Sequence, residues 1–145
     1  MGGAARATRP YAAVVPEFLS EIWLRDLDAA VRASATVAVL APMEIEQVVS
    51  GVPGRGEVRY RIRIDPEGAR VTTEAADEPP DLRLSTDYDT AVAIASGREN
   101  AQIALARGRL RLGGDIEVLV RRAGALGALD DATAALRADT TYPSP

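Results

Sequence analysis

The chain has 145 residues, of which 47% are hydrophobic and 26% charged, so it fits one globular domain. Its net charge of −4 gives no reason to expect nucleic acid as a partner. Every basic residue is arginine, and cysteine and histidine are absent, which excludes thiolate and histidine chemistry, the metal sites they form, and lysine Schiff bases. Most common catalytic mechanisms are therefore excluded, and we expect a non-catalytic protein without a metal or cofactor.

The N-terminal part predicts a leader followed by one amphipathic helix. Residues 1–15 are small and unpatterned, and we expect a flexible leader without a signal peptide. Apolar residues then recur at spacings of three and four over residues 16–32, with Pro16 in the first helical turn. No apolar run approaches the ~20 residues of a membrane span, so we expect a cytoplasmic protein.

The middle of the chain changes to the alternating pattern of strands. Residues 45–48 can begin a strand, residues 58–64 alternate apolar residues with arginines, and residues 71–74 complete a hairpin. A further strand follows at residues 82–85, and we expect an antiparallel meander that is wet on one face.

Two sets of charged residues on these strands need an interpretation. We expect Glu44 and Glu46 to be exposed acids. The arginines are expected to form solvated faces paired with carboxylates, and the alternative is an anchor for an anionic lipid head group. They are Arg59, Arg61, Arg63, Arg109 and Arg111.

The remainder predicts helices separated by glycine stops and one strand. Polar caps and glycines divide it into helices at 87–96, 100–106, 116–122 and 125–138, with a strand at 109–112. Residues 139–145 are expected to be a disordered tail. Helix, then strands, then helices predict an α+β fold, in which helices cover one face of a mostly antiparallel sheet within a single domain of residues 16–138.

Residues 80–120 hold an ordered set of packing residues. The set consists of Pro80-Asp81 before a strand, an acidic helix start at Asp87, a helix end at Gly97, Asn100-Ala101 with Ala104, and the glycine-rich segment Gly108–Asp115. This pattern resembles the sterol carrier protein 2 family of lipid-binding domains. The preceding helix and strands fit in the same order, so the resemblance covers residues 16–125.

The resemblance implies a curved sheet of about five strands with helices on one face, enclosing an apolar tunnel. The implied function is non-catalytic binding or transfer of an apolar lipid, which is a sterol, a fatty acid or acyl thioester, or an isoprenoid. The alternative is an accessory domain of the same fold without a cavity, supporting a partner enzyme in lipid or quinone metabolism. An enzyme is a third alternative. At most weak contact with a membrane surface is expected, because the chain is acidic.

Apolar residues of the later helices and the last strand are the candidate tunnel lining. Periodicity alone does not separate a lining from a solid core, and the resemblance favours the lining. The helices after residue 87 are rich in alanine and glycine, so we expect them to underfill the space beneath the sheet; the alternative explanation of the small residues is close helix packing. The candidate lipid-binding residues are Ile94, Ile103, Leu105, Leu110, Ile116, Leu119, Val120, Leu126 and Leu129.

Overall fold

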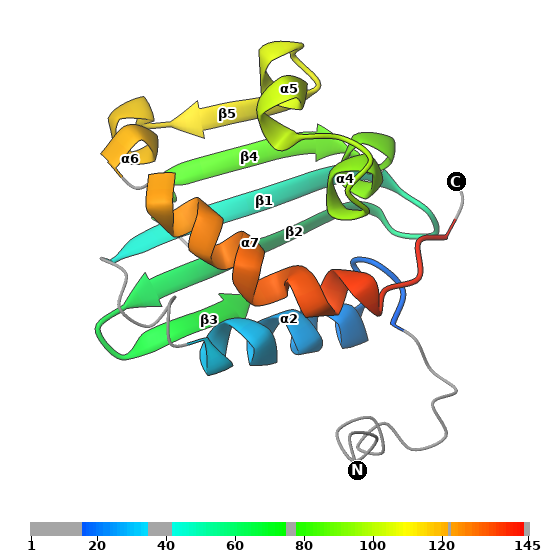
Figure 1. Ribbon diagram of the computed structural model, residues 1–145, viewed down its shortest axis with the longest axis horizontal. Coiled ribbons are helices and arrows are strands. Elements are labelled where there is room, and N and C mark those ends of the chain that lie inside the picture. The colour runs from blue at the N-terminus through cyan, green and yellow to red at the C-terminus, as the bar shows by residue number, and fades with distance from the viewer. Residues whose placement is uncertain (1–15, 35–41, 75–77, 122, 144–145) are drawn as a thin grey trace.

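A five-stranded sheet forms the centre of the computed structural model, with the strand order β3-β2-β1-β4-β5 (Figure 1). The structure describes residues 16–34, 42–74, 78–121 and 123–143, without the side chains of 116, 119, 121, 123–127, 129 and 130. The strands are β1 (Met43–Val52), β2 (Gly56–Asp65), β3 (Gly68–Thr72), β4 (Leu82–Asp87) and β5 (Leu110–Gly114). The helices are α2 (Glu21–Ala33), α4 (Tyr88–Ala95), α5 (Ala101–Ala106), α6 (Ile116–Arg121) and α7 (Ala123–Ala138).

The topology confirms the predicted α+β class and corrects the predicted meander. Strands β1, β2 and β3 are successive antiparallel neighbours, but β4 lies on the other side of β1 and runs parallel to it. At the outer edge of β3, the Val71 backbone N–H donates to the Asp28 carboxylate of α2 at 2.7 Å. Strand β4 extends the sheet beyond β1, and β5 pairs antiparallel with β4.

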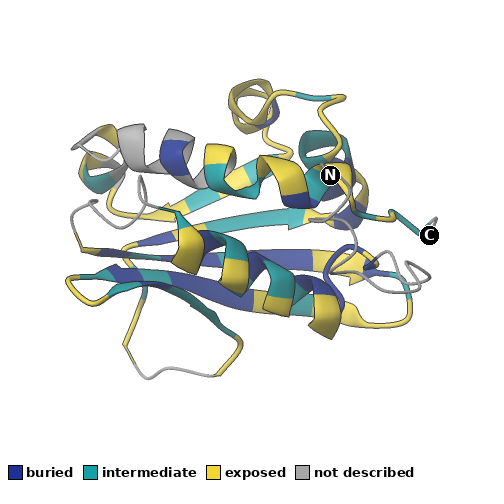
Figure 2. Ribbon diagram, turned by 60° about the horizontal axis from the view of Figure 1, so that its bottom comes forward, coloured by how far each residue is buried: buried dark blue, intermediate teal, exposed yellow. Residues whose placement is uncertain are grey.

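The sheet has two faces of different chemistry. Strand residues alternate between faces, and the register aligns Ile45 with Ile62 and with Leu82 on one face. One position along, Glu46 stands opposite Arg61 and Arg83 on the other face. Helices α2, α4 and α7 lie over the apolar face (Figure 1), and the centre of the sheet is mostly buried while the outward side of α2 is exposed (Figure 2). The core therefore lies between the sheet and this helical layer.

Helix α2 begins later than the predicted residue 16. Ser20 is its N-cap, and the Ser20 hydroxyl accepts from the Trp23 backbone N–H at 3.2 Å. Leu19 has a φ of 68°, so the helix cannot continue toward Pro16. Instead, the Phe18 backbone N–H donates to the Thr141 carbonyl at 2.8 Å, which ties this segment to the C-terminal part of the chain.

The later helices follow the predicted caps. Asp87 accepts from the Thr90 backbone N–H at 2.7 Å at the start of α4, and Asn100 caps α5. Gly97 has the positive φ of 83° expected of a helix stop. The predicted disordered tail differs from the structure over residues 139–143, because Thr141 pairs with Glu17 and the Tyr88 hydroxyl donates to the Pro143 carbonyl at 2.6 Å. Residues 1–15 and 144–145 lie outside the described residues.

Within the described part of the chain, no helix is long and apolar enough to cross a membrane.

Candidate functional site

An apolar groove of about 290 Å³ lies between the sheet and the helices. Its floor comes from the helix-facing sides of β1, β2, β4 and β5, and its other walls come from α4, α5, α7 and the N-terminal segment with α2. The apolar lining residues are Phe18, Trp23, Leu27, Ile45, Val49, Tyr60, Ile62, Leu84, Ala91, Ile94, Ala95, Ala101 and Leu110.

The groove exists because the helices above the sheet carry small side chains. Ala91 and Ala95 of α4 and Ala101 of α5 face it, where larger residues would reach the floor. Protein interiors are otherwise close-packed, so this space is a local departure from an ordinary core. Small residues on the helices after residue 87 were the sequence feature that predicted such underfilling.

Four lining residues are polar, and two of them stand out. Gln47 lies on the helix-facing side of β1, opposite Tyr60, and its side chain is half-buried. The Arg137 guanidinium of α7 donates to the Thr133 hydroxyl at 2.9 Å. Burial raises the pKa of Tyr60 well above its ordinary value, so its hydroxyl stays neutral. The groove thus holds an amide, an arginine and hydroxyls among apolar walls.

The structure brings two of the nine predicted lining residues into this groove. Ile94 and Leu110 line it. Ile103, Leu105 and Val120 do not, and their exposed fractions are 49%, 36% and 72%. Helix α5 is one short segment resting on β5 through the fully buried Ala104, so its neighbours on either side point outward.

The other four predicted lining residues remain predictions. The side chains of Ile116, Leu119, Leu126 and Leu129 lie outside the described residues.

Several lining residues were not predicted, and most come from the strands and α2. Trp23 and Leu27 belong to the apolar stripe of the first helix, and Tyr60 and Ile62 to the alternating strand. These patterns identify residues that face the interior. Which of them border the groove depends on the strand order and on where α4 sits, neither of which a local pattern contains.

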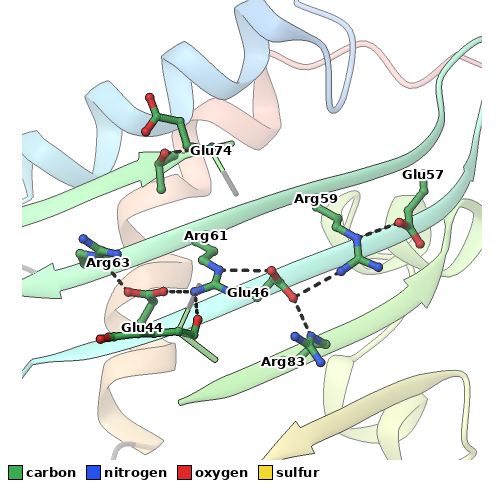
Figure 3. A network of polar contacts seen from close by, with 10 residues as sticks. Glu44, Glu46, Glu57, Arg59, Arg61, Arg63, Glu74 and Arg83 are labelled. Atoms are coloured by element: carbon green, nitrogen blue, oxygen red, sulfur yellow. Dashed lines mark hydrogen bonds and ion pairs between the residues drawn. The ribbon is translucent and has the colours of Figure 1, made fainter. Parts of the chain in front are cut away.

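The opposite face of the sheet carries a network of arginines and glutamates (Figure 3). Glu46 lies at its centre, accepting from Arg61 Nε at 3.2 Å and from Arg83 Nε at 2.6 Å. Arg61 also pairs with Glu44 and donates to the Glu78 carbonyl at 2.9 Å. Pairing with carboxylates was predicted, but the predicted solvent exposure is wrong for Arg61 and Glu46, which are only 6% and 7% exposed.

The network changes the ionisation of its central carboxylate. Burial by itself would raise the pKa of Glu46, but the guanidinium groups of Arg83 and Arg61 outweigh it and hold the pKa below 4.5. Glu46 is therefore a charged structural partner of the arginines. Within the described residues, no group of three or more acidic side chains could hold a metal ion.

Comparison with known proteins places these features in a family. The SCP-2 sterol transfer family model matches residues 29–127. A search of curated proteins found no match. Among solved structures, a conserved hypothetical protein of Thermus thermophilus, described as a possible sterol carrier protein, has a TM-score of 0.63 at 23% identity, covering 88% of this chain and 93% of its own.

Two further structures share the same fold. The sterol carrier protein domain 2 of Helicoverpa armigera has a TM-score of 0.58 at 18% identity, covering 89% of this chain and 94% of its own. The palmitated sterol carrier protein 2 like 2 of Aedes aegypti has a TM-score of 0.53 at 16% identity, covering 73% and 92%. With the family model matching well over half of its length, the chain belongs to the SCP-2 sterol transfer family.

Proposed function

We propose that the protein binds and transfers an apolar lipid, held in the groove between the sheet and the helices. The observation that carries the proposal is the groove itself, about 290 Å³ of space whose lining is mostly apolar side chains. An apolar chain entering it leaves water and fills volume that the helices do not. Family membership and the palmitated Aedes aegypti structure support the same conclusion.

The dimensions of the groove favour a linear chain. Its volume lies at the lower end of the ~300–1,000 Å³ typical of ligand pockets. A single acyl or isoprenoid chain needs less width than a fused ring system, so we infer that linear lipids bind more tightly than sterols. Each buried methylene contributes about 0.8 kcal/mol, so affinity should rise about fourfold per added methylene until the groove is full.

The polar residues of the groove suggest how the lipid head is held. Gln47 places a half-buried amide among the apolar lining residues, and an amide in apolar surroundings is costly unless it finds a partner. Arg137 adds a positive charge to the lining. We infer that a carboxylate or thioester head accepts hydrogen bonds from these two side chains, which a plain hydrocarbon cannot do.

Displacement of a fluorescent fatty acid from delipidated protein tests the proposal. Ala95→Phe places a ring in the groove and should weaken binding at least about tenfold. Ala134→Phe makes the same change on the exposed side of α7 and serves as the matched control. Circular dichroism of both variants verifies that they fold.

The same assay separates lipid binding from the accessory-domain alternative. Equal affinity of the wild type and Ala95→Phe would place the lipid elsewhere. Failure to bind fatty acids, sterols and isoprenoids alike would refute the proposal and leave the interaction domain as the better explanation. Native mass spectrometry of protein purified without detergent identifies any lipid that co-purifies.

A further inference from the structure

A second hollow of about 530 Å³ lies on the charged face of the sheet and shares one lining residue, Thr86, with the lipid groove. Its floor is made by the outward residues of the two central strands β1 and β4, among them Val48, Ser50 and Ser85. Arginines border it from three strands and from the residue before β5, namely Arg59, Arg83, Arg111 and Arg109. Nothing in the lipid-binding proposal uses these residues.

The hollow follows from the register of the sheet. Val48 of β1 is opposite both Arg59 of β2 and Ser85 of β4, and Ser85 is in turn opposite Arg111 of β5. Two small side chains thus separate two long ones across four neighbouring strands. Because the floor residues are short and the flanking residues long, the flat sheet becomes concave at this row.

The charge of the hollow differs in sign from that of the whole protein. Its lining has four arginines against two carboxylates, Glu57 and Asp87, in a chain of net charge −4. Arg59 and Arg83 both reach toward Glu46 (Figure 3), which also serves Arg61, so one carboxylate is shared by three guanidinium groups. Arg59 has a second partner in Glu57 at 2.7 Å and Arg61 has one in Glu44, so Arg83 is the arginine of this group whose charge is only partly compensated.

Arg111 is the least compensated of the four. It is exposed, and within the described residues it has no ion pair, whereas Arg109 pairs with Glu99. A guanidinium presents a planar fork of donors that matches phosphate oxygens, and the hydroxyl of Ser85 adds a donor on the floor. Glu57 and Asp87 can accept hydrogen bonds from hydroxyl groups of the same ligand.

We propose that this hollow binds the phosphate group of a polar phosphate ester. The phosphate lies over Ser85 between Arg111 and Arg83, and the polar remainder of the ester extends toward Glu57 and Asp87. Either a soluble phosphate ester or the head group of a phospholipid can supply this chemistry. The site lies across the sheet from the lipid groove and stands whether or not the groove binds lipid.

Titration with glycerol 3-phosphate and with inorganic phosphate, at constant ionic strength, tests the site in solution. Calorimetry or amide chemical shifts of the full chain follow saturation. Arg111→Gln should weaken glycerol 3-phosphate binding about tenfold. Ser85→Asp introduces a negative charge on the floor and should abolish it. Arg25→Gln is the matched control: it removes an exposed arginine of α2, on the far side of the sheet, and should leave affinity unchanged.

A parallel arm uses vesicles of phosphatidylcholine with and without phosphatidic acid. Binding that requires phosphatidic acid and is lost in Arg111→Gln, but not in Arg25→Gln, assigns the phosphate to a lipid head group. Saturable binding of the soluble ester with the same variant pattern assigns it to a free metabolite. No binding in either arm, or equal weakening by Arg25→Gln, overturns the proposal. In the displacement assay, Arg111→Gln should bind the fluorescent fatty acid as tightly as the wild type does. A loss of phosphate binding would then not reflect a change in the groove.

Discussion

Replacing Glu46 by glutamine removes the central negative charge of the sheet while keeping the shape of the side chain. The carboxylate accepts hydrogen bonds from Arg61 and Arg83. A hydrogen bond to a charged group contributes about 1.5–3 kcal/mol, and the amide keeps one acceptor oxygen. Arg83 is nearly half exposed, so its share is reduced by solvent screening. Arg61 keeps Glu44 as a partner. We therefore expect Glu46→Gln to lower the free energy of unfolding by about 2 kcal/mol.

The pH dependence gives this prediction a second, independent readout. The pKa of Glu46 in the folded protein lies below the ordinary value of 4.5, so the unfolded chain binds the proton more tightly. The stability contributed by the Glu46 charge is therefore complete above pH 4.5 and is lost as the pH falls through the folded-state pKa. The difference between wild type and Glu46→Gln should shrink in the same interval.

Urea unfolding followed by circular dichroism, repeated across this pH interval, measures both effects. Glu57→Gln is the control, because Glu57 pairs with Arg59 on the same face but both side chains are about half exposed. It should change the free energy of unfolding by less than about 0.5 kcal/mol. A loss for Glu46→Gln no larger than that of the control, or one that does not vary with pH, would refute the reasoning.

Three further substitutions test the frame around the groove, each by urea unfolding. Gly114→Ala should lower the free energy of unfolding by at least about 2 kcal/mol, because the backbone φ of Gly114 is 99° and the new methyl would lie 3.2 Å from the Asp81 carbonyl carbon. A smaller loss would mean that β5 shifts freely. Asn100→Ala removes the side-chain oxygen that caps α5 and accepts from the Gln102 backbone N–H at 2.7 Å, so the free energy of unfolding should fall by about 1 kcal/mol. Asn100→Ser should restore most of this loss. Tyr88→Phe should cost about 1 kcal/mol by releasing the Pro143 carbonyl, and no loss would show that the contact is replaced by water.

Local chemistry made part of this structure predictable. A helix needs a side-chain hydrogen-bond acceptor just before its first residue and a residue with left-handed backbone conformation after its last one. Both requirements are met within a few neighbouring residues. Asp87, Asn100 and Gly97 carry these signals, and they lie where the sequence placed them. The hairpin from β2 to β3 was likewise found from its turn residues and its alternation.

The predictions that were wrong concern residues at which segments far apart in the sequence come into contact. Arg59, Arg61 and Arg63 alternate identically in the sequence, yet only Arg61 is buried. The difference comes from the segment after β3, whose Glu78 carbonyl accepts from Arg61, and from Glu44 and Glu46 on the neighbouring strand. Alternation gives the face on which a side chain lies, but not its neighbours.

The same limit applies to the groove. Candidates were sought on the helices after residue 87 and on the last strand, and Ile94 and Leu110 do line the groove. Its floor is built from β1, β2, β4 and β5, and β4 and β5 join β1 and β2 in this floor only because β4 pairs with β1. Pairing of β4 with β1 brings together residues nearly forty positions apart, and no periodicity encodes it.

Trp23 provides an intrinsic fluorescence signal from the groove. It is the only tryptophan of the chain, it lines the groove, and the Tyr60 ring lies 6.2 Å from it. Its indole N–H donates to the Thr140 hydroxyl at 3.1 Å, so the chromophore is held in one orientation. A lipid entering the groove would therefore change the emission of one defined fluorophore, without any label, whereas an anion bound across the sheet would leave that emission unchanged. The emission of the unmodified protein therefore reports whether the groove is occupied and does not respond to the second hollow.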